Sequence, residues 1–136
     1  MYAHHSIDRR LLLVAALVTT ALLGCERPVS FSSQVQPILN ASCISCHAGA
    51  GEGMAKTHLA LDSYEGVMRG TQLGPVVVPG SAASSTLYLA IDHKVDSKIQ
   101  MPPHHSDKFA QGEGKPLSSE QIATIKRWID EGAKQN

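Results

Sequence analysis

Two cysteines and a histidine form the strongest chemical motif of the chain, Cys43-Ile44-Ser45-Cys46-His47. In a helix, residues three or four positions apart share one face, so Cys43, Cys46 and His47 would lie on a single turn. Two thiols placed in this way reach neighbouring vinyl groups of a haem, while the imidazole lies beneath the iron. The spacing therefore predicts covalent attachment of one haem c through Cys43 and Cys46, with His47 as an axial ligand of the iron.

Other chemistry stays open to the same two cysteines. They would make half of a zinc site, although such sites bring a second Cys or His pair at matching spacing, and Cys25 is the only further cysteine. A thioredoxin-like redox pair needs a strand and helix context that this sequence does not predict. A plain disulfide between Cys43 and Cys46 is the remaining alternative.

The second axial position of the iron has several candidate ligands. They are Met54, Met68, Met101, His58, His93, His104 and His105. We select Met101, because Pro102 and Pro103 follow it directly, favour an extended backbone there and remove amide donors from the loop. A stiff loop of this kind can press a thioether onto iron. A slip of one residue in the loop would let His104 or His105 replace the thioether and lower the reduction potential.

The remaining candidates have simpler interpretations. Met54 lies in a glycine-rich stretch too close to His47 to reach the other haem face, and Met68 is interpreted as a core residue. His58 and His93 are interpreted as solvated loop histidines.

Three helices are expected to position these residues. The first spans residues 33–42, directly before the haem motif, and the second spans residues 84–92 and is capped by a serine. The last helix is the clearest, because Ser118 and Gln121 make a capping box ahead of an apolar stripe. That stripe consists of Ile122, Ile125, Trp128, Ile129 and Ala133. Since no alternating strand pattern is convincing, the predicted fold class is all-α.

The stretches between these helices are rich in glycine and proline. Residues 48–57 and 66–80 are predicted to wrap the haem rather than to form regular structure, and residues 98–116 to form an irregular loop. Metal-bound histidines usually donate their outer ring nitrogen to a backbone carbonyl. The Gly74-Pro75 segment is the predicted source of that carbonyl for His47.

The N-terminal residues have the layout of an export signal. Arg9 and Arg10 precede an apolar run over residues 11–23, which is too short to span a bilayer and is typical of a secretory signal peptide. The run ends in Leu-Leu-Gly before Cys25, which resembles the lipobox of bacterial lipoproteins. We therefore predict a lipoprotein signal peptide over residues 1–25 and lipidation of Cys25. Cleavage nearby with Cys25 left as a free thiol, or an uncleaved anchor, are the alternatives.

The exported part of the chain is nearly neutral. Removal of residues 1–25 would leave ten basic and eleven acidic side chains, a balance that gives no sign of nucleic-acid binding. Residues 26–32 are polar and are predicted to be a tether, and residues 33–136 to form one domain. The predicted location is the periplasmic side of a bacterial membrane. Glu26 is not the aspartate that marks inner-membrane retention, which favours the outer membrane.

With these motifs in place, the chain resembles class I c-type cytochromes and is most similar to the planctomycete-type cytochrome c domains. The resemblance follows the family's order through nearly all of the exported chain. It rests on Phe31, Val35-Gln36-Pro37-Ile38-Leu39, the Cys43 to His47 motif, Leu61-Asp62-Ser63, Gly74-Pro75, Val78-Pro79-Gly80, Ser85-Thr86-Leu87, Met101-Pro102-Pro103, Ile122, Ile125, Trp128-Ile129 and Gly132-Ala133.

The resemblance implies a small cytochrome c fold over residues 33–136, with haem in a crevice between His47 and Met101. Its first and last helices would cross. The packing implied between them joins Val35, Ile38 and Leu39 to Ile125, Trp128 and Ile129.

If both faces of the iron are occupied, the protein can change oxidation state but has no free coordination position for a substrate. We therefore expect a membrane-tethered electron carrier and not an enzyme, since paired carboxylates, a Ser-His-Asp set and a phosphate-binding loop are all missing from the sequence. Its partners would be a redox donor and acceptor, and the membrane through the lipid at Cys25. Two alternatives stay open: an electron-transfer subunit of a respiratory complex, or a ligand-binding haem sensor or peroxidase if Met101 does not bind iron.

Overall fold

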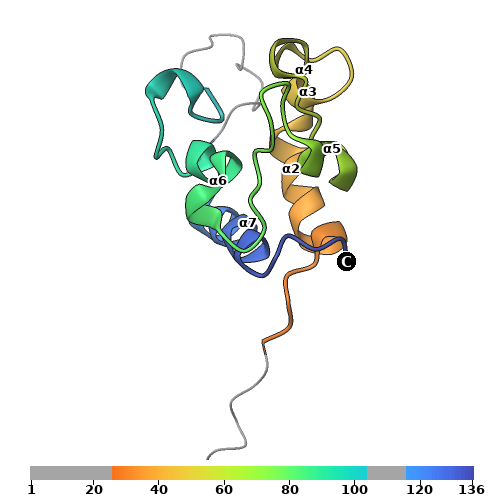
Figure 1. The fold of residues 1–136 in the computed structure, drawn as a ribbon, viewed down its shortest axis with the longest axis vertical. Helices are drawn as coiled ribbons and strands as arrows, with labels where there is room; N and C mark the ends of the chain where they lie inside the picture. The colour runs from red at the N-terminus through yellow and green to blue at the C-terminus, as the bar shows by residue number, and fades with distance from the viewer. Residues whose placement is uncertain (1–25, 104–115) are drawn as a thin grey trace, which may run out of the picture.

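The computed structural model describes residues 26–103 and 116–136, which are built from helices and connecting loops (Figure 1). In chain order the elements are the π-helical η2 (Phe31–Val35), α2 (Gln36–Ser42), α3 (Ile44–His47), α4 (Glu52–Thr57), α5 (Tyr64–Arg69), the 3₁₀ turn η3 (Ala82–Ser84), α6 (Thr86–Ile91), the 3₁₀ turn η4 (Ser97–Ile99) and α7 (Ser119–Asp130). An isolated bridge joins Thr71 and Gly74, and the described residues contain no strand. The all-α fold class is therefore confirmed.

The first helical run begins slightly earlier than expected, at Phe31. The side-chain oxygen of Ser30 caps η2 by accepting a hydrogen bond from the amide of Ser33, and η2 continues directly into α2. Pro37 lies in the first turn of α2, where a residue without an amide proton leaves no bond within that helix unmade. The run ends at Ser42, as expected, and leads at once into the haem motif.

The first and last helices share one hydrophobic core. The cluster holds the residues expected from both helices, namely Val35, Leu39, Ile125, Trp128 and Ile129, with Ile38 packed against it. Phe31 extends this core, because its ring centroid lies 5.2 Å from the ring centroids of both Tyr64 and Trp128. Residues from both ends of the chain therefore share one core, in which η2 contacts α7.

Two short helices form where the sequence predicted irregular structure. The whole of α4 lies within residues 48–57, and α5 overlaps the start of residues 66–80. The side chain of Ser63 caps α5, and an ion pair of 2.7 Å joins Lys56 to Glu52 along α4. Because α4 also contacts α3, packing stabilises a helix that Gly53 disfavours. The prediction of loops was wrong for these two segments.

The middle helix is shifted from its predicted range of residues 84–92. The turn η3 ends at Ser84, and α6 begins only at Thr86. Ser85 lies between them and is fully buried, with its hydroxyl accepting from the amide of Val78 and donating to the carbonyl of Ser81, both at 2.8 Å. A serine therefore occupies the N-cap position of α6, as predicted, but its side chain binds other backbone groups and makes no capping hydrogen bond.

The segment predicted as a tether, residues 26–32, is packed on the domain. Val29 and Phe31 are each 4% exposed and belong to the core cluster. The folded part of the chain therefore begins before residue 33. None of the helices in the described ranges is both long and apolar enough to cross a membrane.

Candidate haem-binding site

The three residues of the haem-attachment motif lie on one helical turn. Cys43 precedes α3 as its N-cap residue, and its carbonyl oxygen accepts hydrogen bonds from the amides of Cys46 (3.1 Å) and His47 (2.9 Å). Both thiols are free and partly exposed. The helices α3 and α4 lie at the end of the molecule opposite the first described residues (Figure 1). The turn thus holds two available sulfurs next to one imidazole.

The ring of His47 is 7% exposed, and one backbone contact sets its orientation. Nδ1 lies 3.3 Å from the carbonyl oxygen of Leu59. A carbonyl only accepts, so Nδ1 carries the proton and Nε2 keeps the lone pair that binds a metal. Burial lowers the pKa of His47, and the hydrogen bond to Leu59 opposes this effect only in part. The imidazole is therefore neutral at pH 7 and suited to bind iron.

The prediction of which carbonyl binds the His47 ring was wrong. The carbonyl of Leu59 binds it, and the Gly74-Pro75 segment does not. The amide of Leu61 also donates to the carbonyl of His47 at 2.8 Å, so the chain after α4 runs directly beside α3. Every residue carries a carbonyl, so the sequence contains no signal that marks this one.

Gly53 of α4 is a second neighbour of His47 that the sequence analysis missed. A Cβ atom added to Gly53 would lie 2.7 Å from Cε1 and 2.8 Å from Nε2 of the imidazole. The hydroxyl of Thr57 donates to the carbonyl of Gly53 at 2.6 Å and accepts from the amide of Leu59 at 3.2 Å. The helix α4 and the Leu59 carbonyl therefore hold the imidazole as one connected unit.

The two cysteines have surroundings that bear on the alternative chemistries. Burial, with a smaller contribution from Cys46, raises the pKa of the Cys43 thiol to about 11. Redox-active cysteine pairs instead have lowered thiol pKa values, so the environment of Cys43 does not favour a thioredoxin-like role. Cys43 and Cys46 form no disulfide. Within residues 26–103 and 116–136, no group of three or more His, Cys, Asp or Glu side chains is placed to hold a metal ion.

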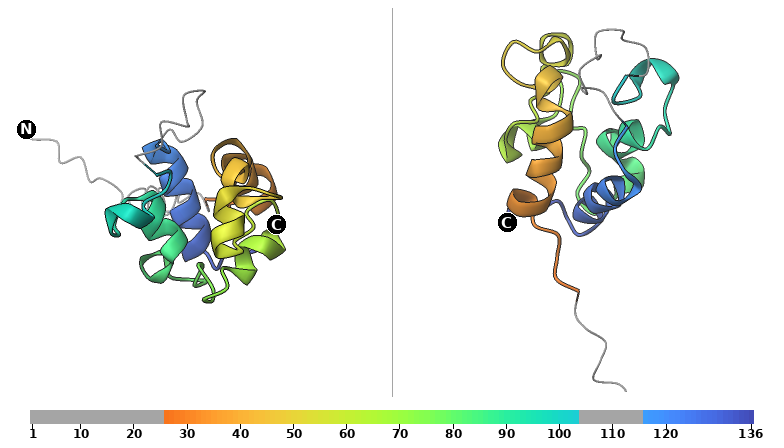
Figure 2. Two further views of the ribbon diagram at one scale, coloured as in Figure 1. Left: turned by 90° about the horizontal axis from the view of Figure 1, so that it is seen from above. Right: turned by 180° about the vertical axis from the view of Figure 1, so that it is seen from behind.

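Met101 lies in the loop after η4, and hydrogen bonds fix the backbone around it. Its amide donates to the carbonyl of Ala90, the penultimate residue of α6, at 3.1 Å. The side-chain amide of Gln100 donates to the carbonyls of His93 and Val95, both at 3.2 Å. The side chain of Met101 packs against the core while staying partly exposed. The segment after η4, which holds Met101, lies across from α3 and α4 in Figures 1 and 2.

The other candidate ligands have different surroundings. Met68 packs against the core, as expected, and Met54 is a partly exposed residue of α4. His58 is exposed and ends α4 with a φ of 59°, which agrees with a solvated loop histidine. His93 is partly buried in the turn after α6, so its interpretation as a solvated residue was wrong. His104, His105 and Cys25 lie outside the described residues.

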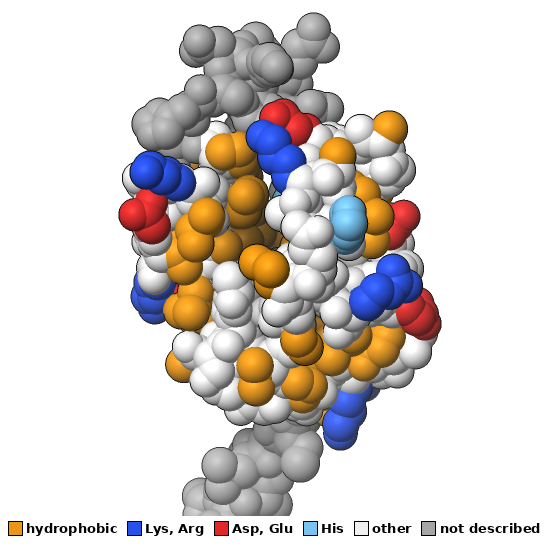
Figure 3. Space-filling view, turned by 45° about the horizontal axis from the view of Figure 1, so that its top comes forward, with side chains coloured by type: hydrophobic (Ala, Val, Ile, Leu, Met, Phe, Trp, Pro, Cys, Tyr) orange, Lys and Arg blue, Asp and Glu red, His pale blue; other side chains and the backbone are white. Residues whose placement is uncertain are grey.

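The residues of this region fit a haem. Haem iron in this class of protein takes an imidazole nitrogen and a thioether sulfur, which His47 and Met101 offer. A flat apolar ring also needs apolar side chains that are packed yet partly open to solvent. Partly buried apolar side chains that pack against the core include Cys43 and Met101. Figure 3 shows hydrophobic side chains gathered around a hollow on the face that carries this end of the molecule.

The helical fold and the attachment motif on one turn define a small c-type cytochrome. Residues 43–105 match the family model described as Planctomycete cytochrome C, so this segment is similar to that family. The resemblance inferred from the sequence is thereby confirmed. Haem binding and electron transfer, with haem c attached covalently, are the properties of this class. No curated protein and no solved structure gives a significant match to the chain.

Proposed function

We propose that this protein is a mono-haem electron carrier with Cys43 and Cys46 as attachment residues and His47 and Met101 as axial ligands. The observation that carries the proposal is the buried, neutral imidazole of His47, whose Nδ1 is held by the carbonyl of Leu59. When bound, haem supplies a reversible one-electron change at its iron. The polypeptide supplies the two ligands, their orientation and a surrounding apolar surface.

A carrier follows from the two ligands, because an iron held on both faces has no position free for substrate. A thioether opposite an imidazole raises the reduction potential, which suits a carrier that feeds a terminal oxidase or reductase. The hydrogen bonds of Gln100 and of the Met101 amide support the same role, since a fixed loop keeps the ligand in place in both oxidation states. The protein would therefore exchange electrons with protein partners and would not be an enzyme.

The membrane location is the second part of the proposal, and its support is the N-terminal sequence. A lipid on Cys25, after removal of the signal peptide, would hold the domain on the periplasmic side of a bacterial membrane. Glu26 next to Cys25 favours the outer membrane. Extraction of the full chain from membranes only by detergent, and its release as a Cys25→Ser variant, tests this part.

The iron ligands are tested by absorption spectra of the haem-loaded protein. Ferric haem with a thioether ligand has a weak band at the near-infrared edge of the visible spectrum, and we expect it to be present and to vanish in Met101→Ala. Met54→Ala is the matched control and should keep the band. If the wild-type protein lacks the band and its reduced form binds carbon monoxide readily, the carrier proposal is wrong and the site is a ligand-binding haem. Purification in a fixed complex would instead favour a subunit role.

A further inference from the structure

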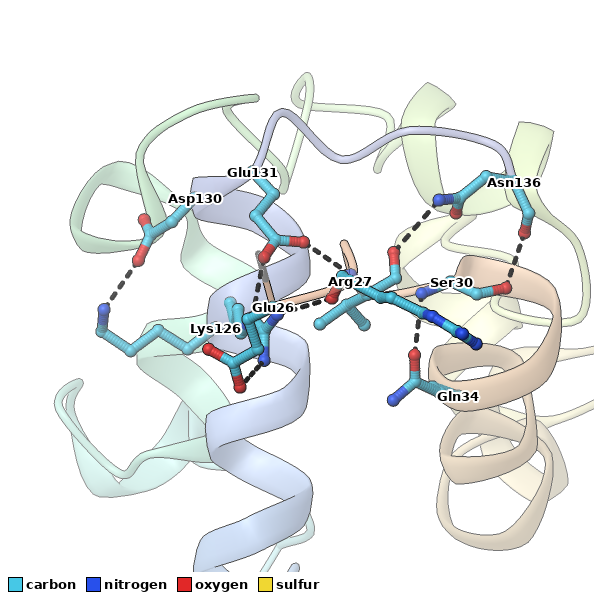
Figure 4. A network of polar contacts seen from close by, with 10 residues as sticks. Glu26, Arg27, Ser30, Gln34, Lys126, Asp130, Glu131 and Asn136 are labelled. Atoms are coloured by element: carbon cyan, nitrogen blue, oxygen red, sulfur yellow. Dashed lines mark hydrogen bonds and ion pairs between the residues drawn. The ribbon is translucent and has the colours of Figure 1, made fainter. Parts of the chain in front are cut away.

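The first described residues are tied to the last helix by charged contacts (Figure 4). We define residues 26–30 as the N-terminal strap. The guanidinium of Arg127 lies 2.6 Å from the carboxylate of Glu26 and also donates to the carbonyl of Arg27 at 2.6 Å. The amide of Val29 donates to the carboxylate of Glu131 at 2.6 Å, and Arg127 binds the same carboxylate at 2.7 Å. The side chain of Arg127 therefore binds the strap directly and also binds Glu131, whose carboxylate accepts the hydrogen bond from the strap.

The last residue of the strap and the first residues of η2 make a second set of hydrogen bonds through consecutive backbone amides. The amide of Ser30 donates to the side chain of Gln34 at 2.9 Å. The amide of Phe31 donates to the side chain of Asn136 at 2.8 Å, and that of Ser32 to the Asn136 carbonyl at 3.0 Å. With Val29, four consecutive amides have acceptors, a pattern that a free tether in water would not show. The strap is thus part of the folded domain.

The strap and the haem motif lie at opposite ends of the protein. In Figure 1 the chain enters at the end formed by η2 and the last residues, while α3 and α4 form the other end. The rear view in Figure 2 shows the same separation along the longest axis. Each residue of extended chain spans at most about 3.6 Å. A lipid on Cys25, one residue before Glu26, would therefore have almost no slack.

We propose that the strap fixes the orientation of the protein on the membrane. The end formed by the strap, Arg127 and Asn136 faces the lipid headgroups, and the end with Cys43 and His47 faces away from the bilayer. This inference rests on the proposed lipid at Cys25. Redox partners then approach from the aqueous side, so a water-soluble protein fits the haem end better than one buried in the same membrane.

Native lysines provide a test that needs no new residue. Lys134 is exposed near the strap end, whereas Lys56 of α4 and Lys98 of η4 are exposed at the haem end. The full lipidated chain on phospholipid vesicles is treated with a membrane-impermeant amine reagent and compared with the soluble Cys25→Ser variant. We expect modification of Lys134 to fall several-fold on vesicles and that of Lys56 and Lys98 to stay unchanged. Equal protection of all three lysines, or protection at the haem end, would overturn the proposal.

A spacer variant separates orientation from anchoring. A flexible Gly/Ser insertion of about 12 residues between Cys25 and Glu26, with an r.m.s. span of about 20 Å, leaves the strap contacts intact but frees the domain. Lys134 should regain full reactivity while the protein stays on the vesicle. If the spacer changes nothing, the strap does not set the orientation. If the Cys25→Ser variant itself stays membrane-bound, the proposed lipid anchor fails, which is a different result from a failure of orientation.

The strap contacts themselves are tested by amide hydrogen exchange of the full chain. Residues 29–32 should exchange slowly in the wild-type protein and several-fold faster in Arg127→Gln. Lys126→Gln is the matched control, since Lys126 is the neighbouring residue of α7 and pairs with Asp130 at 2.6 Å rather than with the strap. Fast exchange in the wild-type protein would show that the strap is loose and would overturn the proposal.

Discussion

The Nδ1 atom of His47 lies 3.3 Å from the carbonyl oxygen of Leu59, and this contact joins α3 to the segment that follows α4. It decides which ring nitrogen carries the proton, and therefore which one is left for iron. The Leu59 carbonyl is positioned in turn by Thr57, whose hydroxyl binds the Leu59 amide. The geometry of the proposed ligand thus depends on residues that touch neither the iron nor the cysteines.

Replacement of Thr57 by Val should loosen His47. The change keeps the side-chain shape but removes the hydroxyl that joins Gly53 to Leu59. We expect a loss of about 1 kcal/mol in the free energy of unfolding, the usual worth of one such hydrogen bond. The Nδ1 proton of His47 should also exchange faster with solvent, as NMR can measure.

Thr124→Val is the matched control for this change. The hydroxyl of Thr124 also donates to a carbonyl four residues earlier, that of Glu120, at 2.8 Å, but it lies on α7. Its loss should leave the exchange of the His47 proton unaltered. Equal effects of the two variants on that proton would contradict a positioning role for Thr57.

Gly53→Ala sets two effects against each other. Alanine in place of glycine favours a helix by about 1 kcal/mol. The added methyl group would, however, lie 2.7 Å from the ring of His47, and overpacking of this kind typically costs about 1–3 kcal/mol. Because the proposed haem attachment would tether α3 through Cys43 and Cys46, the ring would have little freedom to move away. We expect the steric effect to win, with lower thermal stability and an altered ferric haem spectrum.

Gly49→Ala separates that steric effect from backbone strain. Gly49 has a φ of 53° but no atom within 4 Å of an added Cβ. Alanine there should reduce stability through strain alone and leave the haem spectrum as in the wild-type protein. A normal spectrum in Gly53→Ala would mean that α4 moves aside easily, contrary to the connected unit inferred here.

The sequence predicts those parts of the site whose signals lie within a few residues of each other along the chain. The capping box of Ser118 and Gln121 and the buried face of α7 lie within a few residues of each other, and both are present as predicted. The motif from Cys43 to His47 is equally local, and its single turn follows from the spacing. These features need no knowledge of the rest of the fold.

The missed features depend on contacts between distant parts of the chain. The strap was taken for a tether because its composition is polar, yet the acceptors of Val29 and Phe31 are Glu131 and Asn136, about a hundred residues later. Likewise, Gly53 in α4 and the glycines just before it indicate a loop, and the contact of α4 with α3 outweighs that weak local preference. Tertiary contacts of this kind leave no periodic pattern in a sequence.

The strap should weaken in acid through Glu131. The hydrogen bond from Val29 and the ion pair with Arg127 lower the pKa of this carboxyl in the folded protein, relative to an ordinary value of 4.5. The stabilisation is complete above the pKa of the unfolded chain and is lost as the pH falls through the lower folded value. Thermal unfolding should therefore shift to lower temperature as the pH drops below about 4.5.

Glu131→Gln is expected to flatten that pH dependence, since it has no proton to gain. Asp130 contributes in the same direction, because Lys126 and the amide of Ala82 lower its pKa. The unfolding temperature of Glu131→Gln should keep a smaller pH dependence. Its disappearance in the double variant with Asp130→Asn would assign the remainder to Asp130. An unchanged slope in both variants would show that other carboxyl groups govern the acid limit.

Gln100→Ala should weaken the hold on Met101, the proposed second ligand, without changing that residue itself. The variant removes two hydrogen bonds, to the carbonyls of His93 and Val95, that fix the loop just before the thioether. If Met101 binds iron as proposed, a looser loop would let its sulfur leave the iron more often, and an external ligand would gain access. We expect imidazole or cyanide to bind the ferric Gln100→Ala variant several-fold more tightly and faster than it binds the ferric wild-type protein.

Gln72→Ala is the matched control, because the exposed Gln72 side chain donates to the Lys56 carbonyl, away from this loop. Equal binding in wild type and Gln100→Ala would mean that the bond from the Met101 amide to Ala90 and the core contacts of Met101 are enough to hold the loop.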